Sequence, residues 1–213
     1  MLHVHSFIFN AFQENTYIVY DDDGLCAIFD PGMSNHAEQT TLVSYIEQNR
    51  LKPIALYNTH CHIDHVLGNH FIYETYGLIP QFHEGEVPVL VAVQNMAPMY
   101  GFRYETSPIP ETFLAEGETI TIGTQSLRLL FLPGHSPAHL CFYAAEEGFV
   151  IGGDVLFRNS IGRTDLPGGD HQQLLHNIRQ KMYTLPDETV VYPGHGPSTT
   201  IGFEKQTNPF VRE

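Results

Sequence analysis

Four side chains of the kinds that bind metal ions lie within six consecutive positions of this chain. They are three histidines and one aspartate: His60, His62, Asp64 and His65. His60 and His62 are two residues apart, so in an extended or turning backbone their side chains point the same way. The other two follow where the chain turns toward a helix, and they can aim elsewhere. Because imidazoles and carboxylates together suit zinc, iron or manganese, this loop offers ligands for two adjacent metal sites.

Further ligand-type residues stand where predicted strands end. Apolar runs stop at an acid or a histidine at Asp30, at His60 with its neighbours, at His135, at Asp154 and at His195. Sites in α/β proteins gather at the edge of the sheet where strands end and loops begin. Glycines beside the last three residues permit tight turns and close approach there. We therefore expect these side chains to meet at one edge.

The hydrophobic periodicity predicts the elements that position these residues. Strands are expected at 2–9, 15–20, 25–29, 53–58, 78–82, 119–122, 126–132, 140–144, 149–151 and 189–192. Helices are expected at 38–50, 66–76, 84–93 and 172–183, with a last short helix starting near 198–200. The predicted fold class is therefore α/β, with two sheets and helices outside them.

Residues 95–112 contain several prolines and little periodicity. We expect a mobile loop or insertion close to the mouth of the site. Its large side chains either contact substrate or form a satellite core, and the second interpretation has at least equal weight. These side chains are Met96, Met99, Tyr100, Phe102 and Tyr104.

Length and composition limit the classes of protein to which this chain can belong. Its 213 residues fit one α/β domain over residues 1–213, whose halves at 1–116 and 117–213 echo each other. A content of 42 % hydrophobic and 16 % charged residues is ordinary for a folded protein. The formal net charge of −14 repels phosphate backbones and anionic lipids. Nucleic-acid and membrane partners are therefore not expected.

The cysteines and the N-terminal sequence predict a cytoplasmic protein. The chain has three cysteines: Cys26, Cys61 and Cys141. They are too few for a disulfide framework, and their number is odd. This sparse use of cysteine suits a reducing compartment. The N-terminus lacks a basic segment followed by a long apolar run, so no signal peptide is expected. No apolar run is long enough to span a bilayer.

The candidate ligands divide into two sets. One site would have three nitrogen ligands: His60, His62 and His135. A second site would have two histidines and an acid: Asp64, His65 and His195. Asp154 could bridge both metals with one carboxylate oxygen. A water molecule between two such metals loses a proton near neutral pH and becomes a hydroxide nucleophile, while the metals polarise a carbonyl group. This arrangement hydrolyses without a serine or cysteine nucleophile, and Asp64 and Asp154 are the acids expected to take part in catalysis.

The order of these motifs resembles the metallo-β-lactamase-fold hydrolases. Thr-His-X-His-X-Asp-His at 59–65 is followed by Pro-Gly-His, Gly-Gly-Asp and Pro-Gly-His, which end at His135, Asp154 and His195. Within that superfamily the chain looks most like the short glyoxalase II-like (hydroxyacylglutathione hydrolase) proteins, because Ser-Ile-Gly-Arg-Thr-Asp at 160–165 is typical of that branch. The resemblance covers nearly the whole chain.

The resemblance implies a fold and a cofactor. The fold is an αββα four-layer sandwich, in which two mixed β-sheets are flanked by helices. The cofactor is a pair of divalent metal ions, zinc first, with iron or manganese as alternatives. The seven residues assigned above would be the ligands, and Asp154 would be the bridging acid.

The sequence departs from two groups of the superfamily. True β-lactamases usually have cysteine where Asp154 stands, so β-lactam hydrolysis is not expected. Full-length glyoxalase II carries basic glutathione-binding residues in a C-terminal extension, whereas this sequence ends at Glu213. Arg163 is an alternative anion-binding group, but an ion pair with Asp165 agrees with the sequence at least as well.

Three further residues have a functional and a structural interpretation. His139 either lines the pocket or caps a turn and packs, and the second is favoured. Cys61 lies between two histidines, but the alternation that aligns those histidines points it away, so we predict packing rather than a thiolate ligand. Asp30 is expected to orient a metal-bound histidine.

The leading functional hypothesis is hydrolysis of a small-molecule thioester such as S-lactoylglutathione to a hydroxy acid and a thiol. The alternative is a persulfide dioxygenase. Such enzymes resemble this chain in fold and in the Gly-Arg-Thr-Asp segment, and they hold one iron through two histidines and an aspartate, here His60, His135 and Asp154. A lactonase or another ester hydrolase is less favoured. A non-catalytic metal-binding domain is disfavoured because a closed structural site needs only four ligands.

Overall fold

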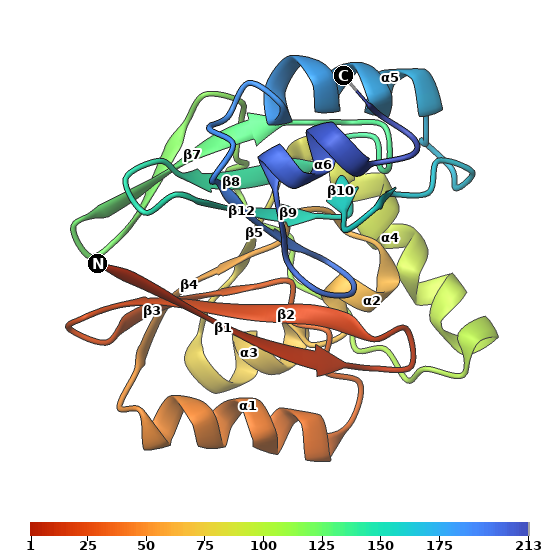
Figure 1. Cartoon of the computed structure of the whole chain (residues 1–213). Coiled ribbons are helices and arrows are strands. Elements are labelled where there is room, and N and C mark those ends of the chain that lie inside the picture. Colours follow the sequence, from red (N-terminus) through yellow and green to blue (C-terminus); the bar gives the residue numbers. More distant parts are fainter. Residues whose placement is uncertain (213) are drawn as a thin grey trace. The chain divides into compact units, whose positions relative to one another are not determined.

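The computed structural model describes residues 1–212 and divides the chain into two compact units. Unit 1 comprises residues 1–114 and 121–125, and unit 2 comprises residues 115–120 and those from 126 onward. Each unit has one main β-sheet with its own helices (Figure 1). Within unit 1, the turn at Gly123 lies directly against the carboxylate of Asp21.

Unit 1 is built on a mixed sheet of five strands in the order β1-β2-β3-β4-β5. The strands are β1 (Leu2–Phe9), β2 (Glu14–Asp21), β3 (Leu25–Phe29), β4 (Lys52–Tyr57) and β5 (Pro80–Gln81). β2 is antiparallel to β1 and to β3, whereas β4 is parallel to β3 and to β5. The carboxyl ends of β3 and β4 therefore lie at the same edge of the sheet, where Asp30 and the histidine loop follow.

Helix α1 (His36–Gln48) begins after the N-cap residue Asn35. The side chain of Asn35 accepts a hydrogen bond from the amide of Glu38, and the Glu38 carboxylate accepts one from the amide of Ser34. Helices α1 and α3 (Asn69–Tyr76) cover one face of the sheet (Figure 1). The buried core between them and the strands consists of Phe7, Phe9, Ile18, Cys26, Ile28, Met33, Leu42, Ile46, Leu51, Leu56 and Ile72. Burial of each large apolar side chain stabilises the fold by about 1.5–3 kcal/mol.

The predicted helix at 66–76 is interrupted. Helix α2 (Ile63–Val66) ends before Gly68, and α3 starts after it. A Cβ atom at Gly68 would lie 2.7 Å from the carbonyl oxygen of Pro31, and the Gly68 amide donates a hydrogen bond to that oxygen. The chain passes too close to Pro31 for any side chain at this position. This contact between distant segments has no signature in the local helical pattern.

The prediction of a loop over residues 95–112 is wrong in its first part. Helix α4 (Val87–Met96) follows a 3₁₀ turn, η1 (Glu84–Glu86), and continues into a second, η2 (Ala97–Tyr100). Pro98 falls in the first turn of η2, where a missing N–H is tolerated. Phe102 and Tyr104 pack against the core cluster that contains Cys61, which agrees with the satellite-core interpretation. Met99 is exposed.

Unit 2 holds most of a mixed sheet of six strands in the order β13-β12-β9-β8-β7-β6, of which residues 121–125, at the turn between β6 and β7, are counted with unit 1. The strands are β6 (Thr119–Ile122), β7 (Gln125–Phe131), β8 (Leu140–Ala144), β9 (Phe149–Gly153), β12 (Val190–Pro193) and β13 (Thr199–Thr200). β9 and β12 run parallel, so they end at the same edge, while β8 is antiparallel to β7 and to β9. A separate small ribbon pairs β10 (Leu156–Phe157) with β11 (Ser160–Ile161).

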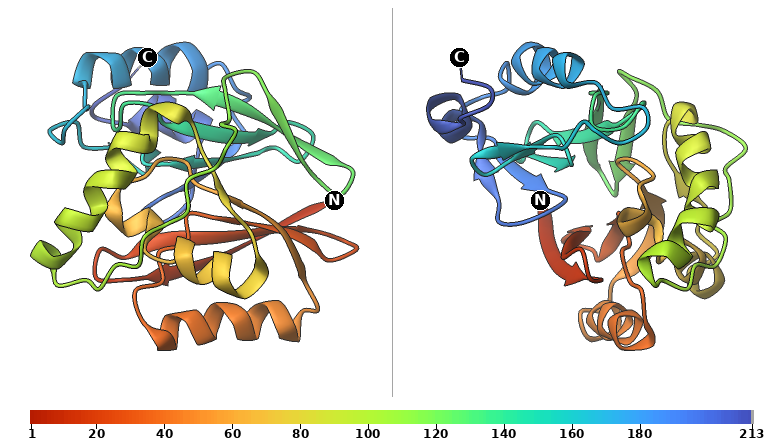
Figure 2. Two further views of the ribbon diagram at one scale, coloured as in Figure 1. Left: turned by 180° about the vertical axis from the view of Figure 1, so that it is seen from behind. Right: turned by 90° about the vertical axis from the view of Figure 1, so that its right-hand side faces the viewer.

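The helices of unit 2 are close to the predicted positions. Helix α5 (His171–Asn177) continues as a π-helical turn, η3 (Ile178–Met182), so the predicted helix at 172–183 changes its hydrogen-bond pattern halfway. Both segments lie over the sheet (Figure 2), where Leu174, Ile178 and Met182 share a core with Val150 and Val191. Helix α6 (Ile201–Thr207) begins at Thr200, whose hydroxyl accepts a hydrogen bond from the helix.

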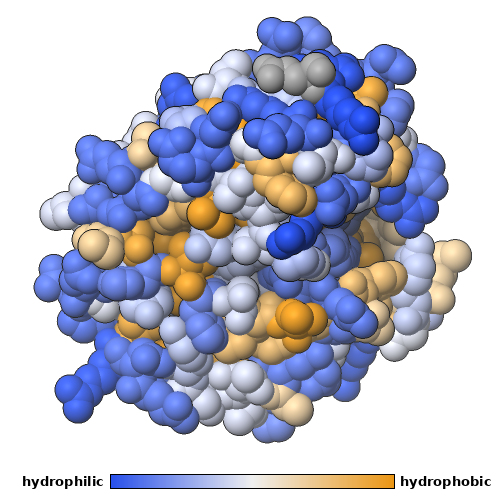
Figure 3. Space-filling model, viewed as in Figure 1, coloured by the Kyte–Doolittle hydropathy of each residue, from blue (hydrophilic) through white to orange (hydrophobic). Residues whose placement is uncertain are grey.

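The predicted fold class is confirmed: the protein is α/β, with two mixed sheets flanked by helices. Among residues 1–212, no helix combines the length and the apolar character that crossing a membrane requires. The face shown in Figure 3 is largely hydrophilic, with apolar side chains in small patches.

Candidate metal centre

Asp30 and Thr59 tie together the segments that follow two parallel strands. The Oδ1 atom of Asp30 accepts a 2.7 Å hydrogen bond from the amide of Thr59, and Oδ2 accepts a 2.7 Å hydrogen bond from its hydroxyl. Both residues are buried. Asp30 has a φ of 47°, a left-handed conformation in which aspartate is enriched. Its carboxylate therefore fixes the start of the loop that carries the histidines.

The hydrogen bonds of Thr59 assign the tautomer of His60. The Thr59 hydroxyl gives its one proton to Asp30, so it accepts from the imidazole Nδ1, which lies 3.0 Å away. In the neutral ring the proton is then on Nδ1, and Nε2 keeps a lone pair. His60 is fully buried. A partner of this kind behind a histidine is the usual way in which proteins orient a metal-binding imidazole.

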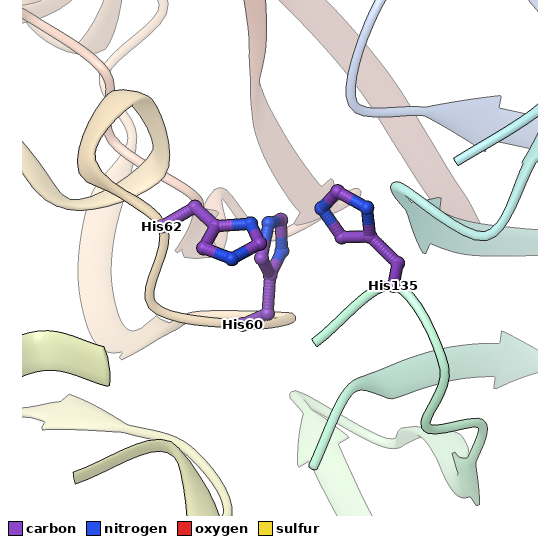
Figure 4. Close-up of side chains that lie close together, drawn as sticks. All are labelled: His60, His62 and His135. Carbon is purple, nitrogen blue, oxygen red and sulfur yellow. The ribbon is translucent and has the colours of Figure 1, made fainter. Parts of the chain in front are cut away.

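The remaining residues of the loop lie beside His60. The rings of His60 and His62 are nearly perpendicular, with centroids 4.7 Å apart. The two side chains lie together (Figure 4), which agrees with the prediction from their spacing that they point the same way. His65 lies in α2, with Nδ1 3.2 Å from Oδ2 of Asp30 and Nε2 3.6 Å from Oδ2 of Asp64. In unit 1 the structure thus gathers every candidate ligand that the sequence placed there.

Asp30, His60 and His65 form a compact buried group. One ligand atom from each lies within 4.8 Å of the others, and all three residues are buried. The Asp30 carboxylate therefore lies close to both imidazoles. The contacts of Asp30 with Thr59 and His65 support the predicted orienting role of its carboxylate.

Cys61 packs away from the histidines, as predicted. Its side chain lies in a small core cluster with Ile63, Val66 and Leu90. Burial raises the pKa of the Cys61 thiol well above its usual range. The backbone amide of Cys61 donates a 2.9 Å hydrogen bond to the buried carboxylate of Glu86, which holds the middle of the loop. The thiol therefore contributes to packing.

Two candidate histidine ligands of unit 2 converge on one carboxylate oxygen of the third candidate, Asp154. Nε2 of His135 lies 3.4 Å from Oδ2 of Asp154, and Nε2 of His195 lies 3.5 Å from the same oxygen. Asp154 and His195 follow the parallel strands β9 and β12, whose ends are joined by a 2.8 Å hydrogen bond from the Gly194 amide to the Gly153 carbonyl. His135, drawn on its own loop in Figure 4, follows β7. The three side chains thus meet beyond the ends of their strands.

The tautomer of His135 shows that this group fits a cation. Its Nδ1 lies 2.7 Å from the backbone carbonyl oxygen of Arg163. A carbonyl oxygen can only accept, so Nδ1 carries the proton, and in the neutral ring Nε2 presents a lone pair to Asp154. A lone pair and a carboxylate oxygen at 3.4 Å repel each other, and a divalent ion bound to both would convert repulsion into attraction.

The side chain of Arg163 forms an ion pair rather than pointing at a ligand site. Its Nε and Nη2 atoms each lie 2.7 Å from a carboxylate oxygen of Asp165. Hydrogen bonding to the guanidinium lowers the pKa of Asp165 to about 2. The structure therefore favours the ion pair that the sequence allowed, and Arg163 supports His135 through its backbone.

Gly162 stands where no side chain fits. A Cβ atom at this position would lie 1.9 Å from the carbonyl oxygen of Asp154 and 3.1 Å from Nδ1 of His135. The Gly162 amide donates a hydrogen bond to the carbonyl of Val155. The Gly-Arg segment that is typical of the glyoxalase II-like branch thus packs against the backbone of one candidate ligand and the imidazole of another.

His139 lies behind Asp154. It is fully buried, and its Nε2 accepts a 3.1 Å hydrogen bond from the Asp154 amide. The favoured interpretation of His139, a turn-supporting and packing residue, agrees with this position.

Sequence patterns gave no sign of some residues that support the loop. Asn10, at the tip of the β1–β2 hairpin, donates 3.0 Å hydrogen bonds to the carbonyl oxygens of Gly32 and Asp64. Glu14 is fully buried and accepts a hydrogen bond from Thr16, and burial raises its pKa well above the usual range. Polar residues such as these are ordinary at turns and strand ends, and only the folded chain brings them to the loop.

Comparison with known proteins places these features in a family. Residues 9–195 match the Metallo-beta-lactamase superfamily. The hydroxyacylglutathione hydrolase GloC of Haemophilus influenzae is 37 % identical over 207 aligned residues, and the match covers 94 % of each chain. The crystal structure of BLEG-1 B3 metallo-beta-lactamase has a TM-score of 0.89 and 36 % identity, covering 99 % of this chain and 100 % of that one. TTHA1623 in a di-iron-bound form has a TM-score of 0.87 and 36 % identity, covering 97 % and 99 %. Motifs, fold and relatives agree that this chain belongs to the metallo-beta-lactamase superfamily.

Proposed function

We propose that this protein is a metal-dependent hydrolase that cleaves a thioester such as S-lactoylglutathione to a hydroxy acid and a thiol. Membership of a superfamily of metallo-hydrolases supports an enzyme. The activity named for GloC supports a thioester as the substrate class. The observation that carries the proposal is the convergence of His135 and His195 on one oxygen of Asp154, because it gathers nitrogen and oxygen donors at the end of parallel strands.

The proposed cofactor is a pair of divalent metal ions. Zinc is the first choice, and the di-iron form of TTHA1623 supports iron as an alternative. When bound, such ions act as Lewis acids and lower the pKa of water so that a nucleophile is available at neutral pH. The residues proposed to hold them are His60, His62, Asp64, His65, His135, Asp154 and His195.

The proposal also assigns positioning and proton-transfer roles to individual residues of the site. Thr59 and the Arg163 carbonyl hold two imidazoles in the tautomer whose Nε2 can bind. In this proposal Asp64, whose side chain is 13 % exposed, accepts a proton from the attacking water. The water oxygen adds to the thioester carbonyl carbon and the C–S bond breaks. A thiolate leaves readily, so the reaction needs no strong general acid.

The decisive assay measures hydrolysis of S-lactoylglutathione by protein whose metal content is quantified in the same sample. We expect turnover with about two metals per chain, loss of turnover after chelation, and recovery when zinc is added back. Asp154→Asn keeps the size of the side chain but removes its charge, and should lower both metal content and turnover by more than about tenfold. Asp165→Asn, an exposed acid of the same segment, is the matched control and should behave as wild type. Wild-type turnover by the chelated protein, or by Asp154→Asn, would refute the proposal.

Two other activities are tested with the same sample. One iron held by two histidines and an aspartate would support persulfide oxidation, so oxygen uptake with a persulfide is measured on iron-loaded protein. The name of BLEG-1 makes β-lactam hydrolysis a third assay, with a chromogenic cephalosporin. Absence of thioester hydrolysis together with oxygen uptake would replace the hydrolase by the dioxygenase.

A further inference from the structure

His139 and Cys141 are two buried, chemically active side chains that the proposed reaction does not use. His139 immediately precedes β8 and Cys141 lies within it, and both have zero exposed area. The side chain of His139 is directed at the backbone of Asp154, with Nε2 3.1 Å from the Asp154 amide nitrogen. An amide can only donate here, so Nε2 is the acceptor. In the neutral ring the proton must then be on Nδ1.

The second ring nitrogen of His139, Nδ1, extends the contact with Asp154 into a chain of hydrogen bonds, which we call the path. Nδ1 lies 3.9 Å from Sγ of Cys141, and the thiol lies 3.2 Å from the carbonyl oxygen of Gly152, to which it donates. Because the thiol proton is directed at Gly152, the sulfur atom can accept from Nδ1. Each donor and each acceptor in the path is therefore used in a consistent direction.

The path begins and ends on the same turn. It starts at the amide of Asp154 and finishes at the carbonyl of Gly152, so it encloses Gly153. Gly153 has a positive φ of 50° and ends β9, and this left-handed residue is what turns the chain out of the strand. The β9–β12 pairing reaches this turn at Gly153, whose carbonyl accepts a hydrogen bond from the Gly194 amide. The geometry of the turn beyond that bond depends on contacts from other segments.

We infer that His139 and Cys141 act together as a positioning pair that holds the Gly152–Asp154 turn and so aims the Asp154 carboxylate. The inference rests on the proposed role of Asp154 as a metal ligand. Packing alone would be served better by apolar side chains, because burying an imidazole costs free energy unless its nitrogens are hydrogen-bonded. Partners behind the ligands tune metal sites strongly, and loss of one weakens metal affinity or activity about 10- to 100-fold.

Zinc affinity of metal-free protein, measured by competition with a chelator, provides the first test. His139→Leu removes the acceptor, whereas His139→Gln can place an oxygen near the position of Nε2. We expect His139→Leu to bind zinc about 10- to 100-fold more weakly and His139→Gln to recover most of that loss. Wild-type affinity in the leucine variant, or equal losses in both variants, would overturn the inference.

Hydrogen exchange of the Asp154 amide, followed by NMR in metal-free protein, provides a second test that does not involve metal binding. Exchange should be faster in His139→Leu than in wild type and close to wild type in His139→Gln. Unchanged exchange in the leucine variant would contradict the positioning role directly. If Asp154→Asn binds zinc as tightly as wild type, the proposed role of Asp154 as a metal ligand fails. That failure is distinguishable from failure of the positioning role, because hydrogen exchange of the Asp154 amide is measured without metal.

Cys141→Ala carries the same test if His139→Leu does not fold. This small change removes both the acceptor for Nδ1 and the donor to Gly152. Cys26→Ala is the matched control, because Cys26 is equally buried in the core of unit 1. We expect weaker zinc binding and faster Asp154 exchange in Cys141→Ala and neither effect in Cys26→Ala. Identical behaviour of the two alanine variants would overturn the inference.

Discussion

The Nδ1 atom of His135 lies 2.7 Å from the backbone carbonyl oxygen of Arg163, and the guanidinium of the same arginine is directed at Asp165 instead. The support for the histidine therefore comes from the main chain. We predict that Arg163→Gln keeps zinc affinity within about threefold of wild type, because only an exposed ion pair worth about 0–1 kcal/mol is lost. Chelator competition measures this, and a loss of tenfold or more would assign the side chain a direct role.

Gly162→Ala should have a much larger effect than Arg163→Gln. The new methyl group would lie 1.9 Å from the Asp154 carbonyl oxygen, so the turn or the strand end must move. Overpacking of this kind costs about 1–3 kcal/mol or more. We expect lower stability in urea unfolding and weaker zinc binding in the same variant. Wild-type values of both quantities would show that the segment is free to shift.

The ion pair of Arg163 with Asp165 has a measurable pH dependence. The pKa of Asp165 is depressed to about 2 from an ordinary 3.8, first because the guanidinium donates hydrogen bonds to the carboxylate. A depressed pKa means that the pair stabilises the fold above pH 3.8 and that this contribution is lost as the pH falls through about 2. In Arg163→Gln the NMR titration midpoint of Asp165 should return to near 3.8. An unchanged midpoint would remove the arginine as the cause.

Asp30→Asn tests whether the buried carboxylate orients the histidines. Asparagine also tolerates the left-handed backbone at this position, so the change is mainly electrostatic. It loses the charged acceptor for the Thr59 hydroxyl and places an amide beside Nδ1 of His65. We predict a loss of zinc affinity of about 10- to 100-fold.

Asp22→Asn is the control for Asp30→Asn, because Asp22 is an exposed acid that pairs with the N-terminal amine. Its zinc affinity should equal that of wild type. Equal affinities in the two asparagine variants would leave Asp30 with a packing role only.

Two residues of β4 allow the stability contribution of core packing to be compared with that of a surface side chain. Leu56 is fully buried in the core of unit 1, whereas Ile54, two residues earlier in the same strand, is 42 % exposed. Leu56→Ala should lower the free energy of unfolding by about 2–5 kcal/mol, from lost burial and the cavity left behind. Ile54→Ala should cost less than about 1 kcal/mol. Urea unfolding of both variants measures the difference, and similar losses would show that Ile54 is buried in solution.

The sequence predicted best those features that have a local signature. Strand alternation located β1, β3 and β8 within a residue, and the spacing of His60 and His62 predicted that their rings would lie together. Ligand-type residues at strand ends were recognisable because parallel strands finish at one edge. That Asp154 bridges two metals is still a prediction.

The features that the sequence did not predict depend on backbone atoms or on contacts between distant segments. The break at Gly68 follows from the nearby Pro31 carbonyl, which the helical pattern of residues 66–76 does not contain. The Arg163 carbonyl that supports His135 is a backbone atom, so no side-chain pattern indicates this contact. The sequence suggested instead that the arginine side chain could bind an anion. Asn10 reaches Asp64 across 54 positions of sequence, a relation that periodicity cannot encode.

The orientation of Cys61 has a consequence for which metal the protein acquires. A thiolate in the histidine loop would have made a soft site that selects zinc or copper(I). Because the thiol is turned into a core cluster and its pKa is raised by burial, the donors that the loop offers are imidazoles and carboxylates. Such donors accept zinc, iron and manganese alike. The metal content would then follow the supply in the host cell, and preparations from different growth media would differ in metal while sharing one sequence.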